Sequence, residues 1–438
     1  MQMFHSIYND GISHLIVVTA LVCGLEFCTS AAFSFIPPLL LKSGVPDSLT
    51  TTLMGCGPLM GFVFCPVIGH ASDRCRSRFG RRRPFILGFC LTIISCLILI
   101  PQSQLLNSPR TGLLLLITTC VLFDFASQAC FNPCESLIYD MCKSTPQEAS
   151  CFFVYSFMTS FGGCLGYMIT AYDWSQSWLS HYLHGQEKLT FIVILLLFTL
   201  TLCCTLMTAN EKALNEDVAV EPLLITNEQE QLTSTSSSDN IKWYLNTNFL
   251  PFKVVTWSVN FFVQAIIYLV LSIISSMRTI MTMPYVLRRL ALADCLSWAA
   301  IMTFNLFFTD FVGQTVYGGD PSAPEFSNER LLYDAGVRAG SYGLLFHCIV
   351  GALYAPALKP LIYQFGIRLT FSFGMFVFVV SMFVMYMSRN IAVVNAMASL
   401  SGLGMASLTS IPYTLVMMYH SNKEVCIMAD NVENSTFN

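Results

Sequence analysis

Charged residues are scarce in this chain. Asp, Glu, Lys and Arg make up 11% of its 438 residues, against roughly 25% in soluble domains. So few charges cannot solvate the surface of a globular protein of this length. The scarcity excludes a soluble fold, and the formal net charge of −4 argues against nucleic-acid binding as a main role.

Motifs of common enzyme and metal-site classes are also missing from the sequence. It contains no GxSxG, no HExxH and no nucleotide-binding glycine loop, so we do not expect an enzyme. It has no CxxC motif and no His/Cys cluster, so no metal and no other cofactor is expected. Almost all of the 18 cysteines fall inside apolar blocks, where cysteine behaves as a small hydrophobic residue rather than as half of a disulfide.

Apolar residues are abundant and unevenly distributed. Residues of the set AVILMFWYC form 54% of the chain, and they gather in blocks of about 20, the length that spans a bilayer's hydrocarbon core. The sequence therefore predicts an all-α polytopic membrane protein with ten spans in a six-plus-four grouping. The predicted spans are 14–36, 49–70, 84–101, 112–134, 151–172, 189–208, 290–310, 336–357, 369–388 and 391–418.

The distribution of basic residues predicts the orientation of these spans. If the amino terminus is cytoplasmic, 16 of the 22 Lys and Arg residues lie in inside segments, as the positive-inside rule requires. We therefore expect both termini in the cytoplasm. The predicted units are a six-helix bundle 1–208, a cytoplasmic linker 209–289, a four-helix bundle 290–420 and a cytoplasmic tail 421–438.

One block does not fit this scheme easily. Residues 254–276 are 23 consecutive uncharged residues, long enough to span the membrane. Spanning would move Arg278, Arg288 and Arg289 to the outer side, so we favour an interfacial or protein-covered helix. A spanning helix remains the alternative.

An arginine-rich loop follows the second predicted span. The segment from Gly69 to Pro84 reads GHASDRCRSRFGRRRP, and its six arginines alone would anchor that end of the protein inside. An anchor, however, does not need Gly69 for a close helix approach, Asp73 to pair with an arginine, or Pro84 at a helix start. These three residues predict a specific structural role for the loop.

This loop resembles the loop motif of the major facilitator superfamily, and DRCRSRFGRRRPF is similar to the pattern of solute carrier family 45 and the plant sucrose transporters. Four more stretches carry the resemblance to that family: Leu122–Asp140, Phe161–Trp174, Met302–Tyr317 and Tyr333–Leu344. The resemblance implies a fold of two helical bundles and proton-coupled symport of a sugar, of the sucrose or hexose class, by alternating access. It also implies a gating motif made of Gly69, Asp73, Arg74, Gly80, Arg81, Arg82 and Arg83.

The family's usual number of helices is twelve, and ten are predicted here. The second bundle is thus expected to be two helices short, and Asp73 is expected to lack the latch partner that the family places on the eleventh helix. An alternative function follows from this difference: a truncated, non-transporting membrane protein that binds or regulates a partner.

Three ionisable residues lie near the middle of predicted spans. Glu26 and Asp124 are about 18 Å from the ends of their spans and His347 about 17 Å, at 1.5 Å per helical residue. Ionisable groups at this depth are costly unless they pair or face water, so each is a functional candidate. Glu26 and Asp124 are predicted to bind the coupled proton. The alternative for these two residues is a neutral, hydrogen-bonded carboxyl that serves packing, and the alternative for His347 is a buried histidine that serves packing.

Polar residues on the fourth span predict a cavity. Asp124, Gln128 and Glu135 fall within about 40° of one helix face, whereas Asp140 lies about 160° around from Asp124 and is expected to contact the cytoplasmic loop. Amides and aromatic faces suit sugar hydroxyls and rings. The predicted substrate-binding residues are Gln128, Asn132, Glu135, Trp298, Asn305 and His347.

The resemblance adds one more carboxyl. Asp310 matches a carboxylate of the plant pattern and is a third candidate for proton coupling. Arg338 is its expected ion-pair partner, and simple solvent exposure of Arg338 is the alternative. Phe308, Gln314 and Thr315 stand where plant members carry charged residues, so plant-like sucrose affinity is not implied. The expected partners are a sugar, a proton and the lipid of a plasma or intracellular vesicle membrane, without nucleic acid; the sequence indicates no oligomeric state.

The predicted topology can be tested by labelling single cysteines from each side of the membrane. Residues 210–250 and 278–289 should both label from the cytoplasmic side, because the arginine distribution places them there. A cysteine in the predicted outer segment 311–335 serves as the control and should label from the opposite face. Labelling of 210–250 and 278–289 from different faces would show that residues 254–276 span the membrane.

Overall fold

A computed structural model describes residues 13–73, 75, 77, 79–103, 108–142, 150–172, 186–208, 270, 273–274, 278, 281, 285–321, 323–324 and 327–436. Every regular element in this part of the chain is a helix, and ten helices are long and apolar enough to cross a membrane. The all-α polytopic class and the ten spans are thereby confirmed. The segment 254–276 and the linker 209–289 lie almost wholly outside the described residues.

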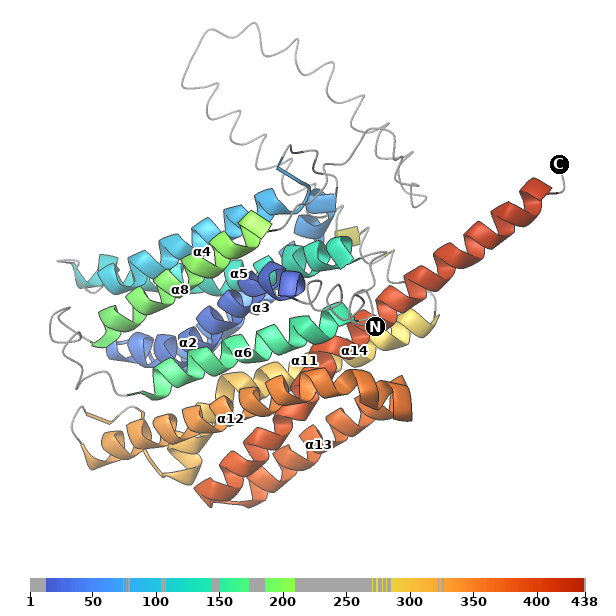
Figure 1. Cartoon of the computed structure of the whole chain (residues 1–438). Helices are drawn as coiled ribbons and strands as arrows, with labels where there is room; N and C mark the ends of the chain where they lie inside the picture. The colour runs from blue at the N-terminus through green and yellow to red at the C-terminus, as the bar shows by residue number, and fades with distance from the viewer. Residues whose placement is uncertain are drawn as a thin grey trace, which may run out of the picture.

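The helices follow one another along the chain in two groups (Figure 1). The first group contains α2 (Ala20–Lys42), α3 (Asp47–Asp73), α4 (Arg83–Ser103), α5 (Pro109–Cys142), α6 (Cys151–Ala171) and α8 (Gln186–Thr208). The second contains α11 (Tyr285–Phe311), the π-helical turn η3 (Val312–Val316), α12 (Asn328–Phe365), α13 (Ile367–Met387) and α14 (Ile391–Thr436).

Several predicted helix ends need correction. The first span was expected to end at residue 36, before two prolines, but α2 continues through Pro37 and Pro38 to Lys42. The segment 421–438 was expected to be a tail after the last span, and α14 continues through it as a helix to Thr436. No Gly or Pro follows Pro412 in this stretch, so nothing in the local sequence stops the helix.

The start of the second group also differs from the prediction. The helix α11 begins at Tyr285, inside the predicted linker rather than at residue 290. The guanidinium carbons of Arg288 and Arg289 lie 5.9 and 4.5 Å from the centroid of the Tyr285 ring. These cation–π contacts stabilise two basic residues in the first turns of an otherwise apolar helix.

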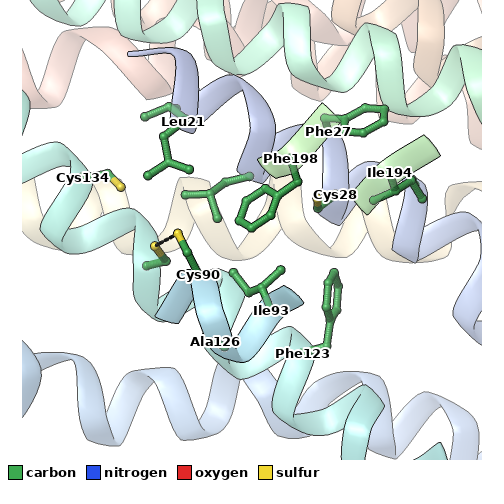
Figure 2. Packing of buried hydrophobic residues seen from close by; sticks show 14 of the residues in the cluster. Leu21, Phe27, Cys28, Cys90, Ile93, Phe123, Ala126, Cys134, Ile194 and Phe198 are labelled. Atoms are coloured by element: carbon green, nitrogen blue, oxygen red, sulfur yellow. Dashed lines mark hydrogen bonds between the residues drawn. The ribbon is translucent and has the colours of Figure 1, made fainter. Parts of the chain in front are cut away.

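The core of the first bundle is built from aromatic, aliphatic and cysteine side chains (Figure 2). Phe27, Phe123 and Phe198, from three different helices, are almost completely buried. The thiols of Cys90 and Cys130 lie 3.9 Å apart, and all described cysteines are free. Cysteine therefore packs here as a small apolar side chain.

The second bundle has its own core, which joins α11, α12, α13 and α14. The Phe304 ring lies 5.0 Å from the Phe308 ring and 6.1 Å, edge to face, from the Phe378 ring, measured between centroids. Such tilted and edge-on pairs stabilise beyond the area they bury. Leu344 of α12 and Leu408 of α14 complete this core.

The two bundles meet along α6, which lies between α2 and α12 and also contacts α14 (Figure 1). Three glycines allow this close packing, because a Cβ atom added to any of them would meet a neighbouring helix. At Gly162 it would lie 3.0 Å from the carbonyl carbon of Cys23, and at Gly166 it would lie 2.7 Å from the Cβ of Ser30. At Gly163, on the other side, it would lie 2.6 Å from the Cys348 sulfur.

Polar side chains also cross between the bundles. The hydroxyls of Ser156 in α6 and Thr409 in α14 are 2.6 Å apart and hydrogen-bonded. The ammonium of Lys359 in α12 donates to the Ser150 hydroxyl, 2.8 Å away, at the start of α6. Polar contacts of this kind between helices contribute to their association in a membrane.

The packing of α6 predicts which glycines tolerate a methyl group. Gly162→Ala should lower the free energy of unfolding by about 1–3 kcal/mol, because the added Cβ meets the backbone of α2, which cannot rotate away. Gly88→Ala in α4 is the matched control, since its added Cβ has no atom within 4 Å. Thermal denaturation of the purified protein measures both; an unchanged melting temperature for Gly162→Ala would contradict this packing.

Candidate functional site

Asp124 of α5 is the centre of the candidate site. It is 6% exposed, and it lines an apolar pocket between α2, α3 and α5 in which it is the only charged residue. The side chain of Gln128, one turn along α5, interacts with the carboxyl. The carboxyl oxygen Oδ2 has no hydrogen-bond partner in the described part of the chain. A buried carboxyl oxygen without a partner is a site at which a proton can bind.

Glu26 of α2 lies in a different environment. The Ser30 hydroxyl, one turn along the same helix, donates to its Oε1 atom over 3.4 Å. The carboxyl is within electrostatic range of Tyr155 and Tyr167 in α6. The two predicted proton-binding residues, Glu26 and Asp124, therefore face different helices, and no described contact joins them.

Glu135 connects the two bundles. The Tyr155 hydroxyl of α6 donates to its Oε1 atom over 2.7 Å, and Tyr413 of α14 also interacts with this carboxyl. The Tyr413 ring stacks on Phe152, with 5.3 Å between centroids. The sequence predicted Glu135 on the stripe of Asp124, and the structure shows that the far end of this stripe reaches the second bundle.

Three residues at this junction were not predicted: Tyr155, Tyr413 and Asp294. Asp294 of α11 interacts electrostatically with Glu135, and its Oδ1 atom is buried without a hydrogen-bond partner among the described residues. Asp294 lies only four residues from the start of the predicted span 290–310, so the mid-span criterion that selected Asp124 did not select it. The tyrosines carry no sequence signal, because aromatic residues are common in every span.

The remaining predicted substrate-binding residues are dispersed. Asn132 hydrogen-bonds to Cys65 of α3, and Asn305 has a buried Oδ1 atom without a partner in the described part. Trp298 packs beside the core of the second bundle. His347 is 2% exposed and its Nδ1 atom lies 2.7 Å from the Ser401 hydroxyl, which favours the packing alternative for this histidine.

The expected ion pair between Asp310 and Arg338 is wrong in this structure. Asp310 instead accepts hydrogen bonds from Gln314 Nε2 and from the Tyr333 hydroxyl, all at 3.0 Å. Tyr333 and Arg338 are both on α12 but five residues apart, about 140° around the helix. Because Tyr333 faces Asp310, Arg338 points away and is exposed.

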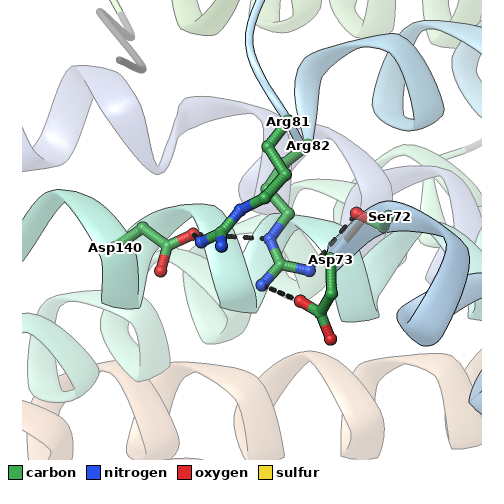
Figure 3. A network of polar contacts seen from close by, with 5 residues as sticks. All are labelled: Ser72, Asp73, Arg81, Arg82 and Asp140. Atoms are coloured by element: carbon green, nitrogen blue, oxygen red, sulfur yellow. Dashed lines mark hydrogen bonds and ion pairs between the residues drawn. The ribbon is translucent and has the colours of Figure 1, made fainter. Parts of the chain in front are cut away.

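The arginine loop forms a compact ionic network (Figure 3). The Arg82 side chain, 9% exposed, lies 2.5 Å from Asp73 Oδ1 and 3.4 Å from Asp140 Oδ2. It also donates to the Ser72 hydroxyl over 3.3 Å, and Arg81 pairs with Asp140 at 2.6 Å. The expected pairing of Asp73 with an arginine and the expected contact of Asp140 with the loop are confirmed.

The described contacts of this network all lie within the first bundle, where they tie the ends of α3 and α5 to the start of α4. Arg83 extends it by donating to the backbone carbonyl of Leu206 in α8. Gly80 has a φ of 107°, a conformation that only glycine adopts without strain. The side chain of Arg74 lies outside the described residues.

The close helix approach expected at Gly69 is not observed. A Cβ atom added there would meet no described atom within 4 Å. The tight approach of α3 to α5 occurs about three turns earlier, at Gly57, where an added Cβ would meet the Asp124 side chain. The presence of a glycine near the helix end therefore did not indicate where the two helices touch.

Comparisons with known proteins identify the class. Residues 6–171 match the family model described as Major Facilitator Superfamily. The fold agrees with a solved structure of a D-xylose-proton symporter, at a TM-score of 0.51 and 12% sequence identity over 94% of this chain and 88% of that one. With its ten apolar helices, the protein is an integral multi-pass membrane transporter of this superfamily rather than an enzyme.

Two relatives identify the family of this chain within the superfamily. Solute carrier family 45 member 3 of Mus musculus is 35% identical over 94% of this chain and 71% of its own length. Proton-associated sugar transporter A of Homo sapiens is 21% identical over 92% of this chain and 76% of its own length. The chain belongs to solute carrier family 45.

The ionic network predicts unequal effects of its two arginines. Arg82→Gln should lower the free energy of unfolding by about 1–3 kcal/mol, because it leaves two aspartates without this partner at a largely buried position. Arg81→Gln should cost less, since its side chain is 23% exposed and ion pairs weaken with solvation. Arg110→Gln, at an exposed position in α5, is the control. Equal melting temperatures for the three variants would contradict the network.

Proposed function

We propose that this protein carries a sugar across a membrane together with a proton, by exposing a site between its two bundles to one side and then to the other. The observation that carries the proposal is the buried Asp124 carboxyl with its unpartnered oxygen. The printed names of one relative and one structural neighbour, a proton-associated sugar transporter and a D-xylose-proton symporter, support the same chemistry.

The role proposed for Asp124 follows from the cost of charge in an apolar setting. An ionised carboxylate without a counter-charge is expensive away from water, and Asp124 has only an amide beside it. It should therefore hold a proton while α2 and α3 cover it and release that proton when the site opens to the cytoplasm. Glu26, a partly buried acid of α2, is the other proposed proton carrier; Asp310 is the third.

The proposed sugar site lies where α5, α6, α11 and α14 meet. Glu135 and the hydroxyls of Tyr155 and Tyr413 are present there, and the Oδ1 atoms of Asp294 and Asn305 on α11 have no partners among the described residues. Sugar hydroxyls both donate and accept, so they suit such a mixture of carboxyls, amides and phenols. We propose a substrate of the sucrose or hexose class.

The orientation in the membrane is part of this proposal. The arginine loop and both termini are placed in the cytoplasm because basic residues concentrate there, and the host membrane is the plasma membrane or that of an intracellular vesicle. In this orientation α5 begins outside, so the pocket that Asp124 lines lies in the outer half of the first bundle.

The proposal is tested with Asp124→Asn in proteoliposomes, using labelled sucrose and labelled glucose as probes. Accumulation driven by a pH gradient should be lost, because an amide cannot carry the proton. Exchange of labelled for unlabelled sugar should persist, since exchange requires no net proton release. Asp334→Asn, in a half-exposed pair with Arg330, is the control and should transport normally. Unchanged accumulation in both Asp124→Asn and Glu26→Gln would remove both residues from the mechanism.

A further inference from the structure

We propose that Gly57 of α3 is a positioning residue for Asp124. In this view the bare backbone at Gly57 provides the space in which the Asp124 carboxyl lies, so that α3 acts as the wall that covers the proton site. The inference rests on the proposed function, because it assigns to Gly57 control over the carboxyl that carries the proton.

The geometry at Gly57 leaves no room for a side chain. An added Cβ atom would lie 2.8 Å from the Cβ of Asp124, 2.5 Å from its Cγ and closer still to Oδ2. The Cβ of Asp124 is fixed to the backbone of α5, so rotation of the aspartate side chain alone cannot relieve the contact. The same Oδ2 atom is the one without a hydrogen-bond partner in the described part. The wall of the site is thus glycine backbone, which keeps water away without donating to that oxygen.

The requirement for glycine is specific to this position on α3. Gly55, two residues away, is exposed, and an added Cβ there would meet no atom within 4 Å. Gly61, one turn beyond Gly57 on the same buried face, would place an added Cβ only near Cys65 of its own helix, at 3.8 Å. Neither glycine is needed for close approach, so both supply matched controls for the effect of a Gly→Ala change on helix stability.

The chain next to Gly57 also allows α3 to move at this point. Pro58 has no backbone N–H, so the carbonyl of Met54 lacks its usual helical partner, and such positions are where helices bend. Leu53 and Met54, in the preceding turn, line the same pocket as Asp124, while the opposite face is open, with Leu59 66% exposed. A shift of α3 at the Gly57–Pro58 pair would therefore uncover the Asp124 carboxyl and the pocket together.

The functional test compares Gly57→Ala with Gly55→Ala in the full chain, reconstituted in proteoliposomes with labelled sucrose and glucose. For Gly57→Ala, gradient-driven uptake should fall about tenfold or more, because small displacements of a reacting group have large effects on rate. The pH dependence of the remaining uptake should also shift, because the added methyl group displaces the Asp124 carboxyl. Gly55→Ala should behave as the unmodified protein. Unchanged uptake with an unchanged pH profile in Gly57→Ala would overturn the inference.

A second measurement is independent of transport. Melting temperatures are compared for Gly57→Ala, Asp124→Gly and the double variant, because Asp124→Gly removes the atoms that the new methyl group meets. Gly57→Ala should lower the melting temperature in the unmodified protein and have little effect in the Asp124→Gly background, while Gly61→Ala should have the same effect in both. If Gly57→Ala alone does not fold, recovery of a folded double variant supports the inference. Equal losses in both backgrounds would overturn it.

The two proposals fail in different ways. If Asp124→Asn accumulates sugar normally, the role of Asp124 in coupling is wrong, yet the melting temperatures still report whether Gly57 makes room for it. If Asp124→Asn abolishes accumulation and Gly57→Ala does not alter uptake or its pH profile, the role of Asp124 stands and that of Gly57 is wrong.

Discussion

The close approach of α6 to α2 on one side and to α12 on the other holds the two bundles together. Apolar side chains gain little by leaving lipid for protein, so helices in a membrane associate through tight packing and polar contacts. Gly162 and Gly166 bring the backbone of α6 against α2, and Gly163 leaves room for Cys348 of α12. The hydroxyl pair Ser156–Thr409 then joins α6 to α14. Tyr155, which donates a hydrogen bond to Glu135 of α5, lies on the helix that these contacts fix.

The acidic residues of the chain are treated in two ways, according to their surroundings. At the arginine loop, Asp73 and Asp140 share Arg82, so each negative charge has a guanidinium partner. Between the helices, Asp124 has the amide of Gln128 beside it, and Glu135 has Tyr155 and the carboxyl of Asp294. The first arrangement ties helix ends together, whereas the second leaves carboxyls without a basic partner among the described residues. The proposed proton coupling requires acids of the second kind.

Composition and helical periodicity predict the parts of this structure that depend on one helix at a time. The number of spans follows from the apolar blocks, and the contact of Asp140 with the loop follows from its angle on α5. The same reasoning failed at Arg338, because the side of α12 that faces Asp310 depends on how α11 and η3 lead into that helix. The predicted end of the first span was also wrong. The two prolines at 37 and 38 were expected to end the helix, but α2 continues through them to Lys42.

Contacts between helices that are distant in sequence could not be predicted. The partnership of Glu135 with Tyr413 joins residues 278 positions apart, and no local pattern marks either tyrosine of the junction. The close approach of α3 was assigned to Gly69 because the motif contains it, but the helix touches α5 at Gly57. Which glycine faces a neighbour depends on the rotation of two packed helices, and one sequence does not contain that information.

The bridge at Glu135 has a thermodynamic consequence. Its carboxyl accepts a hydrogen bond from Tyr155 of the first bundle and also interacts with Tyr413 of the second. A proton added to this carboxyl would remove its negative charge and weaken both interactions, because hydroxyls bond more strongly to a carboxylate than to a neutral carboxyl. Linkage is reciprocal: the factor by which a proton weakens the contact is the factor by which the contact weakens the binding of the proton. The charge of this one side chain and the contact between the two bundles are therefore linked.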